Sequence, residues 1–185
     1  MSIVPSTRPK LEAEKVRAIG QAKGVTAKVY LVGIRGYYDR SLDNKSGNAR
    51  GIYDDALFLV TPEGVYRYNA NTDPSIQRKG IATLKPGVYN YRQDIHPKSR
   101  PGGYPALRPS TKGERLPVTR DGQTGDAWGI AINIHKGSRT RTSSEGCQTV
   151  WPDQWAEFIR KVYFFMDEHA QRTIPYVLIT AEEMP

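Results

Sequence analysis

Cys147 and His135 are the residues of this chain whose types and spacing could support covalent catalysis. Cys147 is the single cysteine of the 185 residues, and it follows His135 by twelve positions in the segment INIHKGSRTRTSSEGCQTVW. A nucleophilic thiolate needs a base within hydrogen-bond reach, and imidazole suits because its pKa lies near neutrality and its charged form lowers the pKa of a thiol. A loop of this length can close on itself. We therefore expect Cys147 to be a nucleophile and His135 to be its base.

The residues around the thiol favour a functional cysteine over a structural one. A free cysteine is usually buried and behaves as a small hydrophobic residue. Here the flanking sequence Ser143-Ser144-Glu145-Gly146 and the following Gln148 are polar or small. Gly146 would allow a tight backbone approach, and the amides of Gly146 and Cys147 could form an oxyanion hole. A buried structural thiol remains the alternative.

The elements on either side of this loop are predicted from hydrophobic periodicity. Residues 128–135, WGIAINIH, alternate as a half-buried strand that ends at His135, and residues 136–147 form a loop. Pro152 can occupy the first turn of a helix. Residues 153–171 carry apolar side chains at helical spacing and predict one long helix. The nucleophile would thus lie between a strand and a helix.

The rest of the chain predicts a mainly β (α+β) fold. Residues 1–24 are expected to form a loose arm and a short helix, and residues 25–185 a single catalytic domain. The long C-terminal helix would pack on a mainly antiparallel sheet. The expected elements are a helix at 11–23, strands at 25–34, 80–96 and 173–180, a hairpin at 55–70, and long polar loops at 35–51 and 97–112.

The composition favours anionic partners but does not identify one of them. The net charge is +8, which favours anionic surfaces such as envelope polymers, phospholipid headgroups or nucleic acid. The basic residues are spread along the chain without a nucleic-acid-binding motif, so we do not expect nucleic acid. No apolar run approaches a membrane span of about 18 residues or a secretory leader. We expect a protein made in a bacterial cytoplasm without a signal peptide, with no membrane insertion.

A histidine at a strand end followed by Ser-x-Gly-Cys resembles the signature of L,D-transpeptidases, the YkuD-like catalytic domains that act on peptidoglycan stem peptides. The match covers about 25 residues, with a looser similarity in KPGVY at 85–89. The resemblance implies an L,D-transpeptidase-like β-sandwich or barrel. It also implies His135 as base, Cys147 as acylated nucleophile, Gly146 and Cys147 as oxyanion-hole amides, and the Lys136 carbonyl as the group that orients the imidazole.

Short segments such as GIRGYYD, NANTDPS and SSEGCQT are similar to small proteins encoded by phages and prophages. The expectation is a monomeric, cofactor-free cysteine hydrolase of peptidoglycan stem peptides that acts on the wall after release or delivery and is attracted to the anionic bacterial envelope. An L,D-transpeptidase or L,D-carboxypeptidase on the same scaffold is one alternative. A non-catalytic wall-binding or virion-associated module is another.

Further residues are weaker candidates for contacts with substrate. His96 opens a polar loop and could line the cleft, with a surface histidine as the alternative. Ser144 and Gln148 flank the thiol, and Arg141 could meet a substrate carboxylate, as could Arg108. Loop arginines are mostly solvated, which is the alternative for both.

Acidic residues and histidines elsewhere are interpreted as structural. Asp54 and Asp55 could be catalytic carboxylates, but a solvated strand entry is favoured. Asn69, Asn71 and Asp73 have the composition of a turn. His169, near a helix end, fits a favourable interaction with the helix dipole. A metal site is not expected, because the only ligand set would combine His96, His135, His169 and Cys147 without a recognised spacing.

Overall fold

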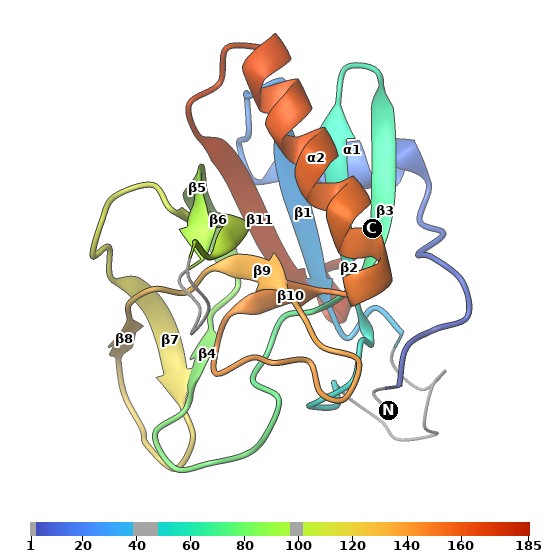
Figure 1. Ribbon diagram of the computed structural model, residues 1–185. Helices are drawn as coiled ribbons and strands as arrows, with labels where there is room; N and C mark the ends of the chain where they lie inside the picture. The colour runs from blue at the N-terminus through green and yellow to red at the C-terminus, as the bar shows by residue number, and fades with distance from the viewer. Residues whose placement is uncertain (1–2, 39–47, 97–101) are drawn as a thin grey trace.

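The computed structural model describes residues 3–38, 48–96 and 102–185 (Figure 1). Within them, eight strands form a closed barrel with short N-terminal and long C-terminal helices, which confirms the predicted mainly β class. The barrel order is β1 (Tyr30–Arg35), β11 (Ile174–Thr180), β5 (Gly87–His96), β6 (Tyr104–Pro109), β9 (Ile134–Lys136), β10 (Gln148–Val150), β3 (Gly64–Asn71) and β2 (Asp55–Thr61).

A second, smaller sheet and the helices surround the barrel. This sheet contains β4 (Ala82–Leu84), β7 (Leu116–Arg120) and β8 (Ala127–Gly129). The helices are α1 (Ala13–Ala22), α2 (Pro152–Glu168) and a short 3₁₀ helix, η1 (Ala181–Glu183). No helix among the described residues is long and apolar enough to cross a membrane.

Strand β2 is buried on both faces and lies between two hydrophobic cores. Leu57 and Leu59 face the main core together with the apolar face of α2, whereas Phe58 and Val60 face a second core with α1. Successive side chains of a strand point to opposite faces, so an uninterrupted apolar run is expected where both faces are covered. The sequence DALFLVT fits that requirement.

Helix α2 begins at Pro152 as predicted and packs its apolar face onto the main core. Its buried side chains are Trp155, Phe158, Ile159, Val162, Phe165 and Met166. In Figure 1 this long helix runs along β1, β2 and β3 toward the end of the barrel that carries β9 and β10. The helix therefore starts directly after the strand that follows Cys147.

Residues 128–135 do not form the single strand that the sequence predicts. They divide into β8, in the small sheet, and the start of β9, in the barrel. Ala131 has a φ of 54°, a left-handed conformation that ends a strand for any residue with a Cβ. The sequence could not reveal this break, because apolar and other residues keep alternating through Ala131.

Three further predictions about elements need correction. The strand predicted at 80–96 is two strands, separated at Lys85-Pro86, and the loop predicted at 97–112 contains β6. The N-terminal segment is not a loose arm in its described part. Arg8 pairs with Glu157 at 2.6 Å, and the carbonyl of Ile3 accepts a hydrogen bond from the Tyr53 amide.

The short parallel pair of β9 and β10 positions the residues of interest. Its register places Ile134 beside Gln148 and His135 beside Thr149. Ile134 and Val150 belong to the main core. Since side chains alternate, His135 and Thr149 lie on the opposite face of this pair.

Candidate active site

Cys147 immediately precedes β10, and backbone groups of the neighbouring segment hold its thiol. The amide of Asn133 donates to Sγ at 3.4 Å, and the thiol donates to the carbonyl of Ala131 at 3.5 Å. The amide of Gln148 donates to the carbonyl of Asn133 at 2.8 Å, which extends the parallel ladder to this point. The thiol is half-buried and its position is fixed by the chain that leads into His135.

The turn before the thiol requires glycine at position 146. Gly146 has a φ of 128°, and a Cβ there would lie 2.7 Å from the carbonyl oxygen of Ala82. Glycine is the residue that populates such conformations without steric cost. The sequence Gly-Cys is therefore explained by the backbone path as well as by any chemistry.

Ser144 braces this turn with its hydroxyl. Its hydroxyl donates to the carbonyl of Cys147 at 2.7 Å and accepts the amide of Gly146 at 3.0 Å. The residue is buried. The predicted substrate contact of Ser144 stays a prediction, and its hydroxyl is engaged on both sides in this structure.

The same contact changes the predicted oxyanion hole. The Gly146 amide is occupied by Ser144, so it does not point to a reacting carbonyl. In the described parts of the chain, no acceptor meets the N–H of Cys147. The amide of Cys147 is therefore the donor that remains available to a developing oxyanion.

His135 is buried with its Nδ1 held against a backbone carbonyl. Nδ1 lies 2.9 Å from the carbonyl oxygen of Lys136 and 3.2 Å from the hydroxyl of Tyr104. The first contact is the one that the resemblance assigns to Lys136. Donation from Nδ1–H to this carbonyl leaves the lone pair on Nε2, which is the tautomer of a general base.

Cys147 and His135 lie on neighbouring segments of the chain at the β9–β10 pair. Cys147 is two residues before Thr149, the register partner of His135, so the strand repeat separates the two positions by roughly 7 Å along the ladder. Tyr104 contacts His135 directly and lies close enough to Cys147 for a charge on the thiol to add to the Tyr104 pKa.

Burial controls the acidity of the thiol. It raises the pKa of Cys147 to about 11, with a smaller contribution from the charge of Glu145, while the Asn133 amide acts in the opposite direction. The expectation that an imidazolium lowers this pKa is thus not met in the resting structure. The thiol is protonated at neutral pH, and a base must remove its proton during attack.

His96 and Tyr104 form an aromatic wall beside His135. The two residues are register partners in the β5–β6 pair, and their rings stack with centroids 5.3 Å apart. The ring of His96 also lies 4.4 Å from that of His135. The structure therefore brings His96 to the site, and it adds Tyr104, which the sequence did not reveal because its strand was predicted to be a loop.

Gln148 and Arg141 differ in their exposure. Gln148 is buried, where its amide donates to the carbonyl of Gly146 and accepts the hydroxyl of Tyr176 at 3.0 Å. The predicted substrate contact by Gln148 stays a prediction, and its side chain is engaged inside the barrel in this structure. Arg141 is exposed and lines a shallow pocket of about 320 Å³ with Ser75, Thr140 and Glu145.

A basic pocket adjoins the backbone that holds the thiol. Its volume is about 230 Å³, and its lining includes Arg92, Arg108, Lys112, Glu114, Ile130 and Ala131. The carbonyl of Ala131 is the one that accepts the thiol hydrogen. Arg92 is paired with Asp94, whereas Arg108 and Lys112 add positive charge. The pocket therefore adjoins a backbone group that holds the thiol.

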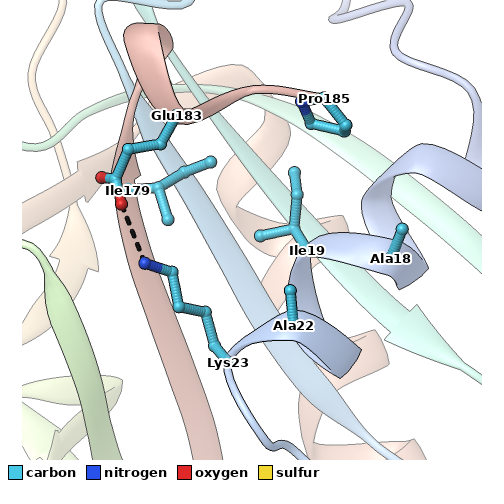
Figure 2. Close-up of a pocket in the computed structure, with 7 residues that line it drawn as sticks. All are labelled: Ala18, Ile19, Ala22, Lys23, Ile179, Glu183 and Pro185. Atoms are coloured by element: carbon cyan, nitrogen blue, oxygen red, sulfur yellow. Dashed lines mark hydrogen bonds and ion pairs between the residues drawn. The ribbon is translucent and has the colours of Figure 1, made fainter.

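A second pocket is remote from these residues. Figure 2 shows it between α1 and the C-terminal end, with Ile19, Ala22 and Ile179 on its walls. Its charged residues, Lys23 and Glu183, pair with each other at 2.8 Å. With a volume of about 360 Å³ it is larger than the basic pocket, but none of its lining side chains is a cysteine, serine or histidine.

The carboxylates at the start of β2 are buried, contrary to the predicted solvated strand entry. Asp54 and Asp55 are at most 3% exposed, and Asn71 and Asp73 lie beside them, also buried. In residues 3–38, 48–96 and 102–185, no three His, Cys, Asp or Glu side chains gather as metal ligands. His169 instead caps α2 and lies 3.4 Å from Glu63.

No family model, curated protein or solved structure matches this chain.

Proposed function

We propose that this protein is a cysteine peptidase of peptidoglycan stem peptides that works through a Cys147 acyl-enzyme. The observation that supports the proposal is the pairing of β9 with β10. Cys147 is the residue before β10, β9 carries His135, and Nδ1 of His135 is held by the Lys136 carbonyl. The L,D-transpeptidase-like motif supplies the reaction class, and the geometry is compatible with it.

The covalent step uses only these groups. Sγ of Cys147 attacks the peptide carbonyl carbon as Nε2 of His135 accepts the thiol proton. The amide of Cys147 stabilises the oxyanion. The C–N bond then breaks, the leaving amine takes the proton from His135, and a thioester remains on Cys147. Water, deprotonated by His135, hydrolyses the thioester and regenerates the thiol.

The thiol pKa of about 11 makes the base indispensable in this scheme. Spontaneous ionisation at neutral pH would give only about one thiolate in ten thousand sites. A base that removes the proton as the C–S bond forms avoids that penalty. This also protects the resting thiol from adventitious oxidation, since the thiolate is the reactive form.

The charge around the site fits an anionic peptide. Arg108 and Lys112 line the pocket next to the Ala131 carbonyl, and the whole chain carries a net charge of +8. Stem peptides carry carboxylates, and charge complementarity of this kind accelerates encounter and orients a ligand. On this proposal the protein reaches the wall by release from the cell that makes it or by delivery.

Product analysis tests the proposal and separates its alternatives. Purified peptidoglycan fragments are incubated with the protein, with Cys147→Ala and with the matched Cys147→Ser, and the products are separated and weighed by mass spectrometry. Peptidase activity predicts shortened stem peptides from the parent alone. Peptides joined to an added amine would identify a transpeptidase, and loss of only the terminal residue a carboxypeptidase. Unchanged fragments that still bind the protein would overturn catalysis in favour of a wall-binding module.

A further inference from the structure

Three buried side chains at the ends of β2 and β3 have oxygen atoms that meet no hydrogen-bond partner among the residues that the structure describes. These residues, Asp54, Asn71 and Asp73, are at most 3% exposed, and we refer to them as the oxygen cluster. The atoms are Oδ1 of Asp54, Oδ1 of Asn71 and Oδ1 of Asp73. Buried polar atoms are nearly always paired, so three such oxygens in one place require an explanation.

The strand register shows that these oxygens are neighbours. Asp55 pairs with Ala70 across β2 and β3, so the preceding Asp54 lies opposite the following Asn71. Side chains at directly opposed positions have Cβ atoms about 5 Å apart on one face of a sheet. The amide of Asn71 donates to the backbone carbonyl of Asp73 at 2.6 Å, which brings the third member to the same place.

The other oxygen of each carboxylate accepts a hydrogen bond from residues 48–49. Oδ2 of Asp54 accepts the amide of Ala49 at 2.7 Å, and Oδ2 of Asp73 accepts the side-chain amide of Asn48. Both carboxylates therefore flank residues 48–49 while each keeps one oxygen unpaired. Asn48 is exposed, so the cluster lies directly beneath the surface at this point.

Charge at the cluster is not balanced by the described side chains. Asp55 is also buried, and its oxygens accept the amides of Gly36 and Thr72 at 2.6 and 2.5 Å. Arg35 faces Asp55 and Asp73, whereas Arg50 is committed to Asp121 in a bidentate pair. The three carboxylates thus share Arg35, whose guanidinium also donates to Thr72 and to the carbonyl of Leu84.

We propose that Asp54, Asn71 and Asp73 bind a divalent cation that prefers oxygen ligands. Two carboxylates and an amide carbonyl are hard donors of the type that Ca²⁺ and Mg²⁺ use, and the set contains no nitrogen or sulfur ligand that would favour zinc or copper. A charge of +2 matches the two carboxylates of the set, those of Asp54 and Asp73. The site does not depend on the proposed peptidase activity.

The position of the cluster gives the cation a structural role near His135. Asn71 pairs with Thr149 across β3 and β10, and Thr149 pairs with His135 across β10 and β9. The cluster and the imidazole are therefore joined by one row of register partners. A bound cation would fix the β2–β3 end of this row and residues 48–49.

Calorimetric titration of the full chain, stripped with EDTA and then freed of it, tests the site. CaCl₂ is the probe and MgCl₂ the comparator, each alone, and thermal unfolding is followed in parallel. We expect one saturable site per chain and a higher Tm with the bound ion. Asp54→Asn and Asp73→Asn should each weaken binding by about tenfold or more, because ligand charge sets affinity at such sites.

Two controls make the result decisive. Asp126→Asn removes a carboxylate that is 93% exposed and should bind as the parent does, and so should Cys147→Ala. Absence of heat and of any Tm change with millimolar Ca²⁺ and Mg²⁺ on the parent protein would overturn the site, and would show that protons or water satisfy the cluster. Equal affinity in well-folded Asp54→Asn and Asp73→Asn would overturn it as well.

Discussion

Burial of a few side chains decides the chemistry that this protein can perform. Cys147 is held by the backbone of residues 131–133, and His135 by the carbonyl of Lys136, so both reactive atoms are positioned by the main chain. Substitutions of neighbouring side chains should therefore leave these backbone contacts in place. Predictions at this scale therefore concern the reactive atoms and the glycine that places them.

The thiol should react slowly with alkylating reagents at neutral pH. Since burial raises its pKa to about 11, the thiolate population, and with it the rate with iodoacetamide, should rise about tenfold per pH unit from pH 7 toward 11. Intact mass measured over time at each pH gives the rate. Fast labelling at pH 7 with a plateau would instead show a thiolate–imidazolium pair and contradict the protonated resting state.

Removing the base should abolish turnover while leaving the fold intact. His135→Gln keeps the size and polarity of the side chain but cannot accept the thiol proton, so kcat should fall by about 10² to 10⁴ with KM little changed. His169→Gln is the matched control, since His169 lies at the end of α2 beside Glu63. A His135→Gln variant with parental kcat would remove His135 from the mechanism.

Gly146→Ala should be more harmful than the same change at another left-handed glycine. Both Gly146 and Gly113 have positive φ, which costs about 1–2 kcal/mol for alanine, but a Cβ at Gly146 would also meet the carbonyl of Ala82 at 2.7 Å. Gly113 has open space around it. Urea unfolding should show the larger loss of stability for Gly146→Ala, and equal losses would mean that the turn adjusts freely.

The site residues that could be predicted from the sequence lie in one segment, whereas those that could not be predicted come from distant segments. Cys147, His135 and the Lys136 carbonyl follow from a local pattern within one segment, and the structure places the His135 imidazole against that carbonyl. Tyr104 and the buried Asp54 come from distant segments. Their roles depend on which strands pair, and side-chain type alone does not encode that pairing.

At the scale of elements, the long helix is the part of the fold most directly determined by local pattern. Its apolar positions recur at helical spacing, Pro152 begins it, and the structure buries the predicted face. The strands are harder to predict. β9 and β10 have three residues each, which is too short for an alternating hydrophobic pattern to be recognised. The break at Ala131 depends on backbone conformation, which alternation does not report.

Helix α2 should account for a large share of the folding free energy. Phe158 is fully buried in the main core and packs edge-on to Tyr68, so Phe158→Ala should lower the free energy of unfolding by about 3–5 kcal/mol. Phe164 is 56% exposed on the same helix, and Phe164→Ala should cost far less. Chemical denaturation of the two variants measures the difference. Equal effects would place the packed face of the helix elsewhere.

At the scale of the whole molecule, the barrel brings together segments that are far apart in the chain. Residues near 96, 104, 135 and 147 meet at one side of the barrel because β5, β6, β9 and β10 are neighbours in its order. The parallel pairing of β1 with the final strand β11 closes the structure between its two cores. The sequence predicted the mainly β class and the two helices, but not this order, because strand order is set by contacts between distant segments.

Trapping of the acyl-enzyme is the measurement that tests the central claim most directly. The protein is mixed with a purified stem peptide, quenched in acid at short times, and weighed intact, with Cys147→Ala in parallel. The account predicts a mass increase equal to the acyl part of the peptide, located on Cys147 after digestion and absent from the variant. Cleaved peptide without any adduct, or cleavage by Cys147→Ala, would contradict a covalent mechanism at this thiol.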